Sequence, residues 1–178
     1  TVSQFDTSNV TDMSSMFYGC TALTTVPNFS ATNKLTNCNN MFYNCFKLES
    51  VEFSGLPLVT KIDHMFYACT KIKSIKLGNL SKVESLSAND SYYKEFTRCN
   101  SLEELYFDNL GYSFTKQEYL DLSDCNNLSD TAIQNILDGV ANLSSKSFNC
   151  YITFPDAIKN KITSAQKTAL NKKKWYLD

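Results

Sequence analysis

The amino-acid sequence predicts an α/β solenoid, in which short repeated units of helical turn and strand stack along one axis. Two observations predict it: a five-residue motif recurs along the chain, and the spacing of apolar residues changes within each copy. The motif Met-Phe-Tyr-x-Cys occurs at residues 16–20, 41–45 and 65–69, and degraded copies follow at 95–99 and 121–125. Self-similarity at a period of roughly 20–50 residues is the signature of a stacked repeat architecture.

Recurring apolar positions extend the motif on its C-terminal side. The motif cysteines step by 25, 24, 30 and 26 residues, and their positions are Cys20, Cys45, Cys69, Cys99 and Cys125. An aliphatic residue stands three residues after each cysteine, at Leu23, Leu48, Ile72, Leu102 and Leu128. This regularity predicts about five copies over residues 1–128, of which the last two are degenerate.

The apolar period changes inside each copy. Up to the cysteine, the first copy spaces its apolar residues by 3, 3, 1 and 3, which places them on one helical face: Val10, Met13, Met16, Phe17 and Cys20. After the cysteine the period is two, as in the pairs Val51 and Phe53, Ile75 and Leu77, and Leu105 and Phe107. Each copy should therefore hold a short helical or 3₁₀ segment, a turn and a strand that pairs in parallel with the next copy. The expected fold is therefore a leucine-rich-repeat solenoid.

Stacking should place like residues above one another in the core. One expected column is Phe17, Phe42, Phe66 and Phe96, and a second is Met13, Cys38 and Ile62. The five motif cysteines fall at an inward position, so they are expected to be buried free thiols. Cys-x-x-Cys spacing is absent from the sequence, so neither a metal site nor any other cofactor is expected.

The repeat pattern stops after Leu128, and residues 129–178 are expected to form an α+β capping unit. Ser129 or Asp130 can cap a helix that runs to about Val140. Alternating apolar residues predict a strand within 147–154, and a capping box from Thr163 to Gln166 opens a last helix that ends near Lys172. Such a unit would cover the last apolar rung of the repeats.

Composition and motifs argue against several function classes. The 178 residues carry a net charge of −1, which gives no electrostatic reason to bind nucleic acid. No apolar run reaches about 18 residues, so no segment here is expected to insert into a membrane. The protein is expected to be a monomer. The only histidine, His64, is expected on the outward side of a turn, away from the inward cysteines. We therefore expect no enzyme and no catalytic residue.

Six tyrosines are the candidate residues for contacting a partner. Tyr92 and Tyr93 lie in an insertion of about six residues around 87–94, and insertions in solenoids often lie on the binding face. Tyr18, Tyr43 and Tyr67 form an expected column on the outer surface, and Tyr106 occupies an outward strand position. The three stacked tyrosines would hold a sugar or a peptide, or they would only cover the core. Tyr92 and Tyr93 would contact a partner, or they would fold back on the solenoid.

The outward strand positions carry a second candidate surface. One column is Thr24, Glu49, Lys73 and Glu103, and the other is Pro27, Glu52, Lys76 and Tyr106. Neighbouring strands lie about 4.8 Å apart, so opposite charges stand side by side. This face either pairs its own charges and fixes the strand register, or it recognises a ligand.

Residues 6–23, Asp-Thr-Ser-Asn-Val-Thr-Asp-Met-Ser-Ser-Met-Phe-Tyr-Gly-Cys-Thr-Ala-Leu, resemble the BspA-like leucine-rich-repeat family of bacterial surface proteins. The subtype is the one first catalogued as a domain of unknown function in bacterial lipoproteins, and the tail from Leu120 onwards is similar to the terminal cap of many gut-bacterial members. The resemblance implies a cell-surface or secreted location and adhesion to host matrix proteins or other cells, through a protein or glycan ligand. It carries over no catalytic residues. A passive spacer that displays another domain is the alternative.

Overall fold

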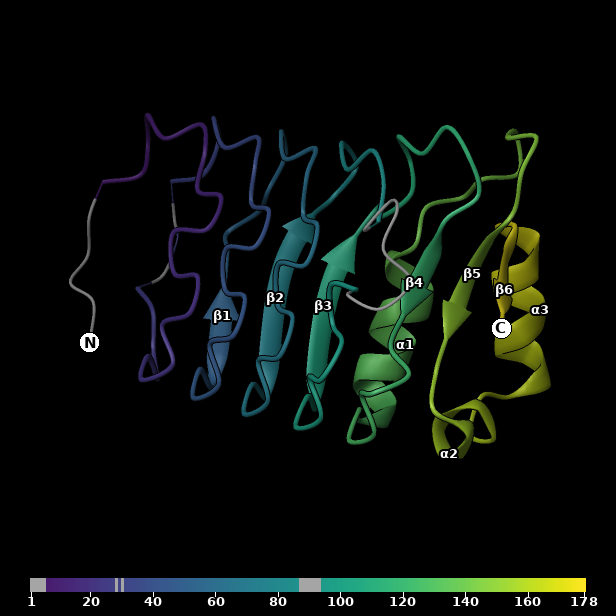
Figure 1. The fold of residues 1–178 in the computed structure, drawn as a ribbon. Helices are drawn as coiled ribbons and strands as arrows, with labels where there is room; N and C mark the ends of the chain where they lie inside the picture. The colour runs from purple at the N-terminus through teal and green to yellow at the C-terminus, as the bar shows by residue number, and fades with distance from the viewer. Residues whose placement is uncertain (1–5, 28, 30, 87–93) are drawn as a thin grey trace.

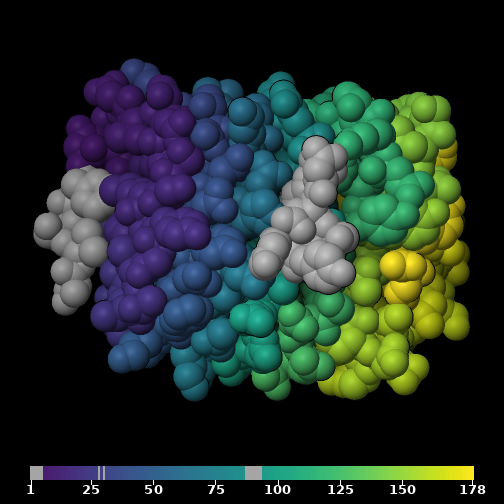
Figure 2. Space-filling model, in the orientation of Figure 1, coloured from purple at the N-terminus to yellow at the C-terminus, as the bar shows by residue number. Residues whose placement is uncertain are grey.

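The structure, a computed structural model, describes residues 6–27, 29, 31–86 and 94–178. It is a mixed α/β structure with two parallel sheets of three strands each. The chain advances from one end of the molecule to the other, so that the first copies and the last helix lie at opposite ends (Figure 1). In the space-filling view, successive segments form successive bands across the surface (Figure 2).

The first sheet contains one strand from each of the second, third and fourth copies. Its strands are β1 (Ser50–Glu52), β2 (Ser74–Asn79) and β3 (Glu104–Asp108), in the order β1-β2-β3. All pairs are parallel, and the buried residues of equal motif position face each other, as in Val51↔Ile75 and Ile75↔Leu105. The predicted strands and their parallel pairing are confirmed. The first copy contributes only isolated bridges to this sheet.

The segment before each motif cysteine is a run of turns, so the predicted helical or 3₁₀ segment is wrong. In the first copy, bonds from residue i+3 to residue i close the turns, for example Met16 N–H to the Met13 carbonyl oxygen at 3.2 Å. Left-handed residues interrupt the helical path, with φ of 57° at Ser15 and 68° at Gly19. The spacing of apolar residues correctly indicates that the chain turns here. It does not reveal the residues with left-handed φ that prevent a regular helix.

These turns form a second ladder of hydrogen bonds between copies. Alternate N–H groups of residues 13–19 donate to carbonyl oxygens of the second copy at 2.8–2.9 Å, in the pairs Met13 to Asn37, Ser15 to Asn39, Phe17 to Met41 and Gly19 to Tyr43. The N–H groups between them close turns within the copy. The first four copies are thus bonded to one another on both of their sides, which gives these backbone groups partners.

Stacked phenylalanines form the centre of the core, as predicted. Ring centroids lie 5.5 Å apart for Phe17–Phe42, 5.5 Å for Phe42–Phe66 and 6.0 Å for Phe66–Phe96, with nearly parallel planes. The second expected column, Met13, Cys38 and Ile62, is also buried. The repeat spacing therefore identified these two core columns correctly.

All seven cysteines are free thiols. Four motif cysteines are buried, and each thiol donates to the carbonyl oxygen of the phenylalanine one copy earlier: Cys45 to Phe17 at 3.1 Å, Cys69 to Phe42 at 3.1 Å, Cys99 to Phe66 at 3.2 Å and Cys125 to Phe96 at 4.0 Å. The motif cysteine thus belongs to the hydrogen-bonded stacking of copies as well as to the apolar core.

Two first-copy residues that were expected in the core are exposed instead. Cys20 is exposed, and Met16 keeps 44% of its surface accessible, whereas Met41 and Met65 are buried at the same motif position. The difference is positional, because the copies that hold Met41 and Met65 are hydrogen-bonded to a described copy on each side, whereas the first copy is bonded only to the second. Val10, at the same end, is half-buried.

The helix α1 (Asp130–Gly139) follows the repeats where the sequence predicts it. Ser129 is its N-cap, and the Ser129 hydroxyl oxygen accepts the Ala132 N–H at 3.0 Å. The helix packs against β3, and its end comes very close: a Cβ on Gly139 would lie 2.1 Å from the Phe107 carbonyl oxygen. Only glycine permits this approach, so α1 takes the place beside β3 that a further strand would fill.

A second sheet lies toward the C-terminal end of the molecule (Figure 1). Its strands are β4 (Tyr119–Asp121), β5 (Cys150–Thr153) and β6 (Trp175–Leu177), all parallel and in that order. The helices α2 (Asp156–Lys159) and α3 (Ser164–Lys172) connect β5 to β6.

The sequence predicted part of this C-terminal unit. It predicted β5 and α3 with its capping box, but not β4, α2 or β6. Because β4 precedes residue 128 and β5 follows it, the sheet spans the expected boundary, and the division into two domains there stays a prediction.

Candidate binding surfaces

Three of the candidate tyrosines form one column, here called the tyrosine stack: Tyr18, Tyr43 and Tyr67. Each follows the buried phenylalanine of its copy, so the turn directs it away from the core. Ring centroids lie 4.8 Å apart for Tyr18–Tyr43 and 4.6 Å for Tyr43–Tyr67, with angles of 7° and 24° between planes. The expected column is therefore confirmed as a geometric feature.

The tyrosine stack is accessible at one end only. Tyr18 keeps 53% of its surface exposed and Tyr43 is half-buried, but Tyr67 keeps only 8%. The fourth copy covers the Tyr67 end of the stack, since the Ala68 N–H donates to the Thr97 carbonyl oxygen at 2.8 Å. The expectation that all three rings offer a contact surface is thus corrected: Tyr18 and Tyr43 offer one, and Tyr67 packs inside.

The remaining candidate tyrosines are not gathered with the tyrosine stack. Tyr92 and Tyr93 lie outside the described residues. Tyr106 lies on β3, in the first sheet, and keeps 40% of its surface exposed. Its hydroxyl donates to Asp108 Oδ2 at 2.6 Å, and this bond to the carboxylate raises the pKa of Tyr106.

The outward face of the first sheet pairs its own charges. Lys76 Nζ lies 3.8 Å from Glu52 Oε2, its register partner on β1, and Lys73 Nζ lies 4.0 Å from Glu103 Oε1. More than half of each side chain is exposed, so each pair contributes about 0–1 kcal/mol. These contacts favour a face that fixes strand register over one that presents unpaired charges to a ligand.

A groove lies where the strands of the first sheet end, and we call it the strand-end groove. Its volume is about 390 Å³. The described residues that line it are Asn33, Ser54, Gly55, Pro57, Gly78, Asn79, Tyr106 and Asp108. It combines one candidate tyrosine with polar residues from three copies, which sequence reasoning did not bring together.

Two glycines let the copies meet beneath this groove. Gly78 has a φ of 64°, and a Cβ there would lie 2.9 Å from the Gly55 Cα. A Cβ on Gly55 would meet no atom within 4 Å. The register of β2 against β3 shifts between Lys76 and Gly78. Bare backbone and a local irregularity therefore shape the groove.

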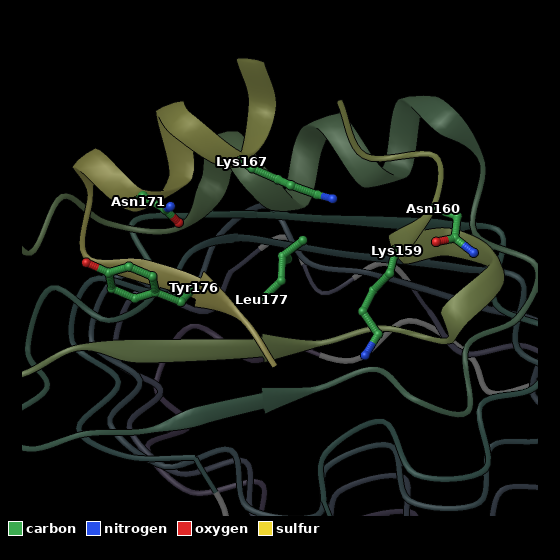
Figure 3. A pocket seen from close by; sticks show the side chains of 6 residues that line it. All are labelled: Lys159, Asn160, Lys167, Asn171, Tyr176 and Leu177. Carbon is green, nitrogen blue, oxygen red and sulfur yellow. The ribbon is translucent and has the colours of Figure 1, made fainter. Parts of the chain in front are cut away.

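Two further grooves carry lysines. One lies beside the outward strand face, has a volume of about 400 Å³, and is lined by Thr24, Lys47, Glu49, Lys71 and Lys73. The other, of about 310 Å³, lies in the C-terminal unit and is lined by Lys159, Asn160, Lys167, Asn171, Tyr176 and Leu177. Figure 3 shows Lys167 reaching from α3 above Leu177. The Lys159 ammonium there already donates to the Asp178 carbonyl oxygen at 2.8 Å.

A second column of tyrosines lies on the second sheet, and the sequence reading missed it. Centroids lie 5.1 Å apart for Tyr119–Tyr151 and 6.1 Å for Tyr151–Tyr176. The sequence holds one signal for this column, because each of these tyrosines directly precedes a leucine or isoleucine that is buried or half-buried. The strands holding Tyr119 and Tyr176 have only three residues, so no period of two stands out there.

Ionisable groups inside the described part of the chain do not gather into a metal centre. Among these residues, no three His, Cys, Asp or Glu side chains are placed to hold a metal ion together. His64, expected to face outward, is half-buried at a left-handed φ of 56°. Glu118 is buried and accepts the Leu86 N–H at 3.3 Å, and burial raises the pKa of its carboxyl group. Over the same residues, no helix has the length and apolar character needed to cross a bilayer.

The described residues define a mixed α/β protein whose main part is a series of stacked copies of about 25 residues. Residues 1–103 match the family described as "Mycoplasma protein of unknown function, DUF285", and the chain belongs to this family. The matched part includes the three full motifs and the fourth cysteine. No curated protein and no solved structure matches the chain.

Proposed function

We propose that the chain is a BspA-like leucine-rich-repeat solenoid that serves as a non-enzymatic binding module on a cell surface or outside the cell. It would contact proteins of a host matrix or of other cells. The hydrogen-bonded stacking of copies on both of their sides supports the solenoid, and the resemblance of residues 6–23 supports the location and the adhesive role. The proposed partner is a protein, with a glycan as the alternative ligand.

The exposed end of the tyrosine stack is the observation that carries this proposal. Tyr18 and the neighbouring Met16 keep 53% and 44% of their surfaces accessible, and Tyr43 lies parallel to Tyr18 at 4.8 Å. Aromatic side chains and methionine are enriched at protein interfaces, and tyrosine buries much surface at little cost in side-chain entropy. The backbone ladder between the first and second copies fixes the backbone that carries these residues before a partner arrives.

The paired charges on the outward strand face support the second candidate, a passive spacer. On this face Lys76 pairs with Glu52, and Lys73 pairs with Glu103, so fewer unpaired charges are available to a partner. A spacer needs only stiffness, which two hydrogen-bond ladders supply.

A binding screen separates the two candidates. The purified chain is immobilised and exposed to a panel of extracellular-matrix proteins and to whole cells. The proposal expects saturable binding that weakens at least tenfold in Tyr18→Ala, because the exposed ring is the main contact. Tyr112→Ala is the matched control, since Tyr112 is also exposed but lies outside the tyrosine stack. Absence of binding to every member of the panel would favour the spacer.

A further inference from the structure

We propose that the strand-end groove binds a neutral saccharide. This inference rests on the proposed function, because it gives a ligand class to a binding module, but it concerns a different surface from the tyrosine stack. The groove has about 390 Å³, within the range of roughly 300–1,000 Å³ that small-molecule sites occupy.

The lining of the groove suits a ligand with many hydroxyl groups and no charge. Among the described residues that line it, Asp108 is the only charged one, and the others offer amides, a hydroxyl, backbone and one aromatic ring. An anionic ligand such as a phosphate would face a carboxylate with no lysine or arginine to balance it. A sugar hydroxyl both donates and accepts, so it can bond to a carboxylate and to an amide at once.

Tyr106 and Asp108 form a fixed pair at one wall. They stand two residues apart on β3, hence on the same side of the strand, and the Tyr106 hydroxyl donates to Asp108 Oδ2 at 2.6 Å. The bond orients the carboxylate and leaves Oδ1 available to accept from a ligand hydroxyl. Tyr106 keeps 40% of its surface exposed, so the C–H face of a sugar can lie against its ring.

Asn79 supplies a fixed amide next to this carboxylate. It is the register partner of Asp108 across β2 and β3. The Asn79 Oδ1 atom accepts the Ser81 N–H at 2.9 Å, which leaves the Nδ2 group as a donor toward the groove. An amide donor and a carboxylate acceptor side by side match two neighbouring hydroxyls of a sugar ring.

A peptide fits this place less well. An extended peptide gains most of its affinity by pairing with an open strand edge. Gly78 and Asn79 belong to β2, where β3 pairs with one edge of the strand and the backbone of Ser54 and Gly55 lies against Gly78. The backbone floor at Gly55 and Gly78 lets a ring approach closely, but it offers no strand to extend.

An NMR titration tests the proposal. The ¹⁵N-labelled chain is titrated separately with lactose, maltose, cellobiose and N,N′-diacetylchitobiose, and backbone amides are followed by residue. At least one of these sugars should shift Gly55, Gly78 and Asn79 with saturation in the millimolar range. Tyr106→Ala and Asp108→Asn should weaken that binding at least tenfold, whereas Tyr112→Ala should not change it. Circular dichroism and thermal unfolding show that each variant is folded.

Each other outcome overturns the inference. Absence of saturable shifts with all four sugars would do so, as would equal affinity in Tyr106→Ala. Tighter binding of 3′-sialyllactose than of lactose would contradict a preference for neutral sugars. Shifts caused only by a peptide library would show that the groove binds peptides instead. A wild-type chain that binds matrix proteins or cells but none of the sugars would overturn this inference and leave the proposed function intact.

Discussion

Each buried motif cysteine has two roles in the stack of copies. Cys69, for example, fills apolar space and also donates its thiol to the Phe42 carbonyl oxygen at 3.1 Å. That oxygen already accepts the Cys45 N–H within its own copy, so one carbonyl group serves two donors. A small residue with a weak donor is needed here, which explains why the motif ends in cysteine.

Thiol labelling should therefore single out Cys20. The other six cysteines are buried, and burial raises the pKa of Cys38 and Cys45 to about 12 and of Cys150 to about 11, so little thiolate is present at neutral pH. In native buffer, mass spectrometry after iodoacetamide treatment should show one fast modification. Cys20→Ser should abolish it. Fast modification of several cysteines at once would contradict the buried column.

The phenylalanine column should dominate stability at the residue scale. Phe42 is fully buried between Phe17 and Phe66, so Phe42→Ala should lower the free energy of unfolding by about 3–5 kcal/mol. The measurement is urea unfolding followed by circular dichroism. Tyr18→Ala, at the exposed end of the tyrosine stack, should cost much less and serves as the control. Equal losses of unfolding free energy in the two variants would show that the phenylalanine column does not dominate the stability of the core.

Among the elements, the turns differ most from what the sequence suggests. Residues of equal motif position adopt a left-handed φ whether or not they are glycine: Gly19, Asn44, Ala68 and Arg98. Glycine and asparagine adopt this conformation readily, but alanine and arginine do so at a cost of about 1–2 kcal/mol. The hydrogen bonds to the next copy hold them there, so the neighbouring copy overrides the local preference.

Arg98→Gly should relieve that cost. The side chain is exposed at a φ of 62°, so the substitution frees the backbone and exposes no core. Arg98→Ala is the matched comparison, because it also removes the side chain but keeps a Cβ. We expect the glycine variant to be more stable than the alanine variant by about 1 kcal/mol in thermal or chemical unfolding. The reverse order would mean that the left-handed conformation is not strained.

Strand length and the repeat motif together decide which elements the sequence revealed. The pairs Ile75 and Leu77, and Leu105 and Phe107, alternate within strands of six and five residues, and these strands were predicted. The strands β1, β4 and β6 have three residues each, but only β1 follows a motif cysteine, so only β1 was predicted. Strand β5 was found because its alternation extends to Phe148 and Phe154.

At the scale of the whole molecule, the strand-end groove could not be predicted because it joins distant residues. Asn33, Gly78 and Tyr106 come from three copies, and only the register of the sheet brings them together. The sequence does mark the place, since polar or glycine pairs end each strand at one motif position: Ser54-Gly55, Gly78-Asn79 and Asp108-Asn109. Such pairs predict turns, but not that the turns enclose a groove.

Glu118 links the repeats to the C-terminal unit and should make stability depend on pH. Burial raises the pKa of its carboxyl group above the ordinary value of 4.5, so the folded state binds the proton more tightly than the unfolded state. Stability therefore falls as pH rises from 4.5 through the folded pKa, and the cost persists above it.

Glu118→Gln keeps an oxygen for the Leu86 N–H and removes the charge. It should unfold at a higher temperature than the wild type at pH 7, and the difference should vanish below about pH 4.5. Calorimetry across this range measures it. A difference that is constant with pH would rule out titration of Glu118 as the cause.

The two ladders between copies also determine how the molecule would respond to force. Their hydrogen bonds point along the stack, from one copy to the next, so a pull on opposite ends of the molecule loads them one rung after another. Each copy that detaches would release about 25 residues, or roughly 80 Å of extended chain. Under tension the protein would therefore lengthen in steps of about this size.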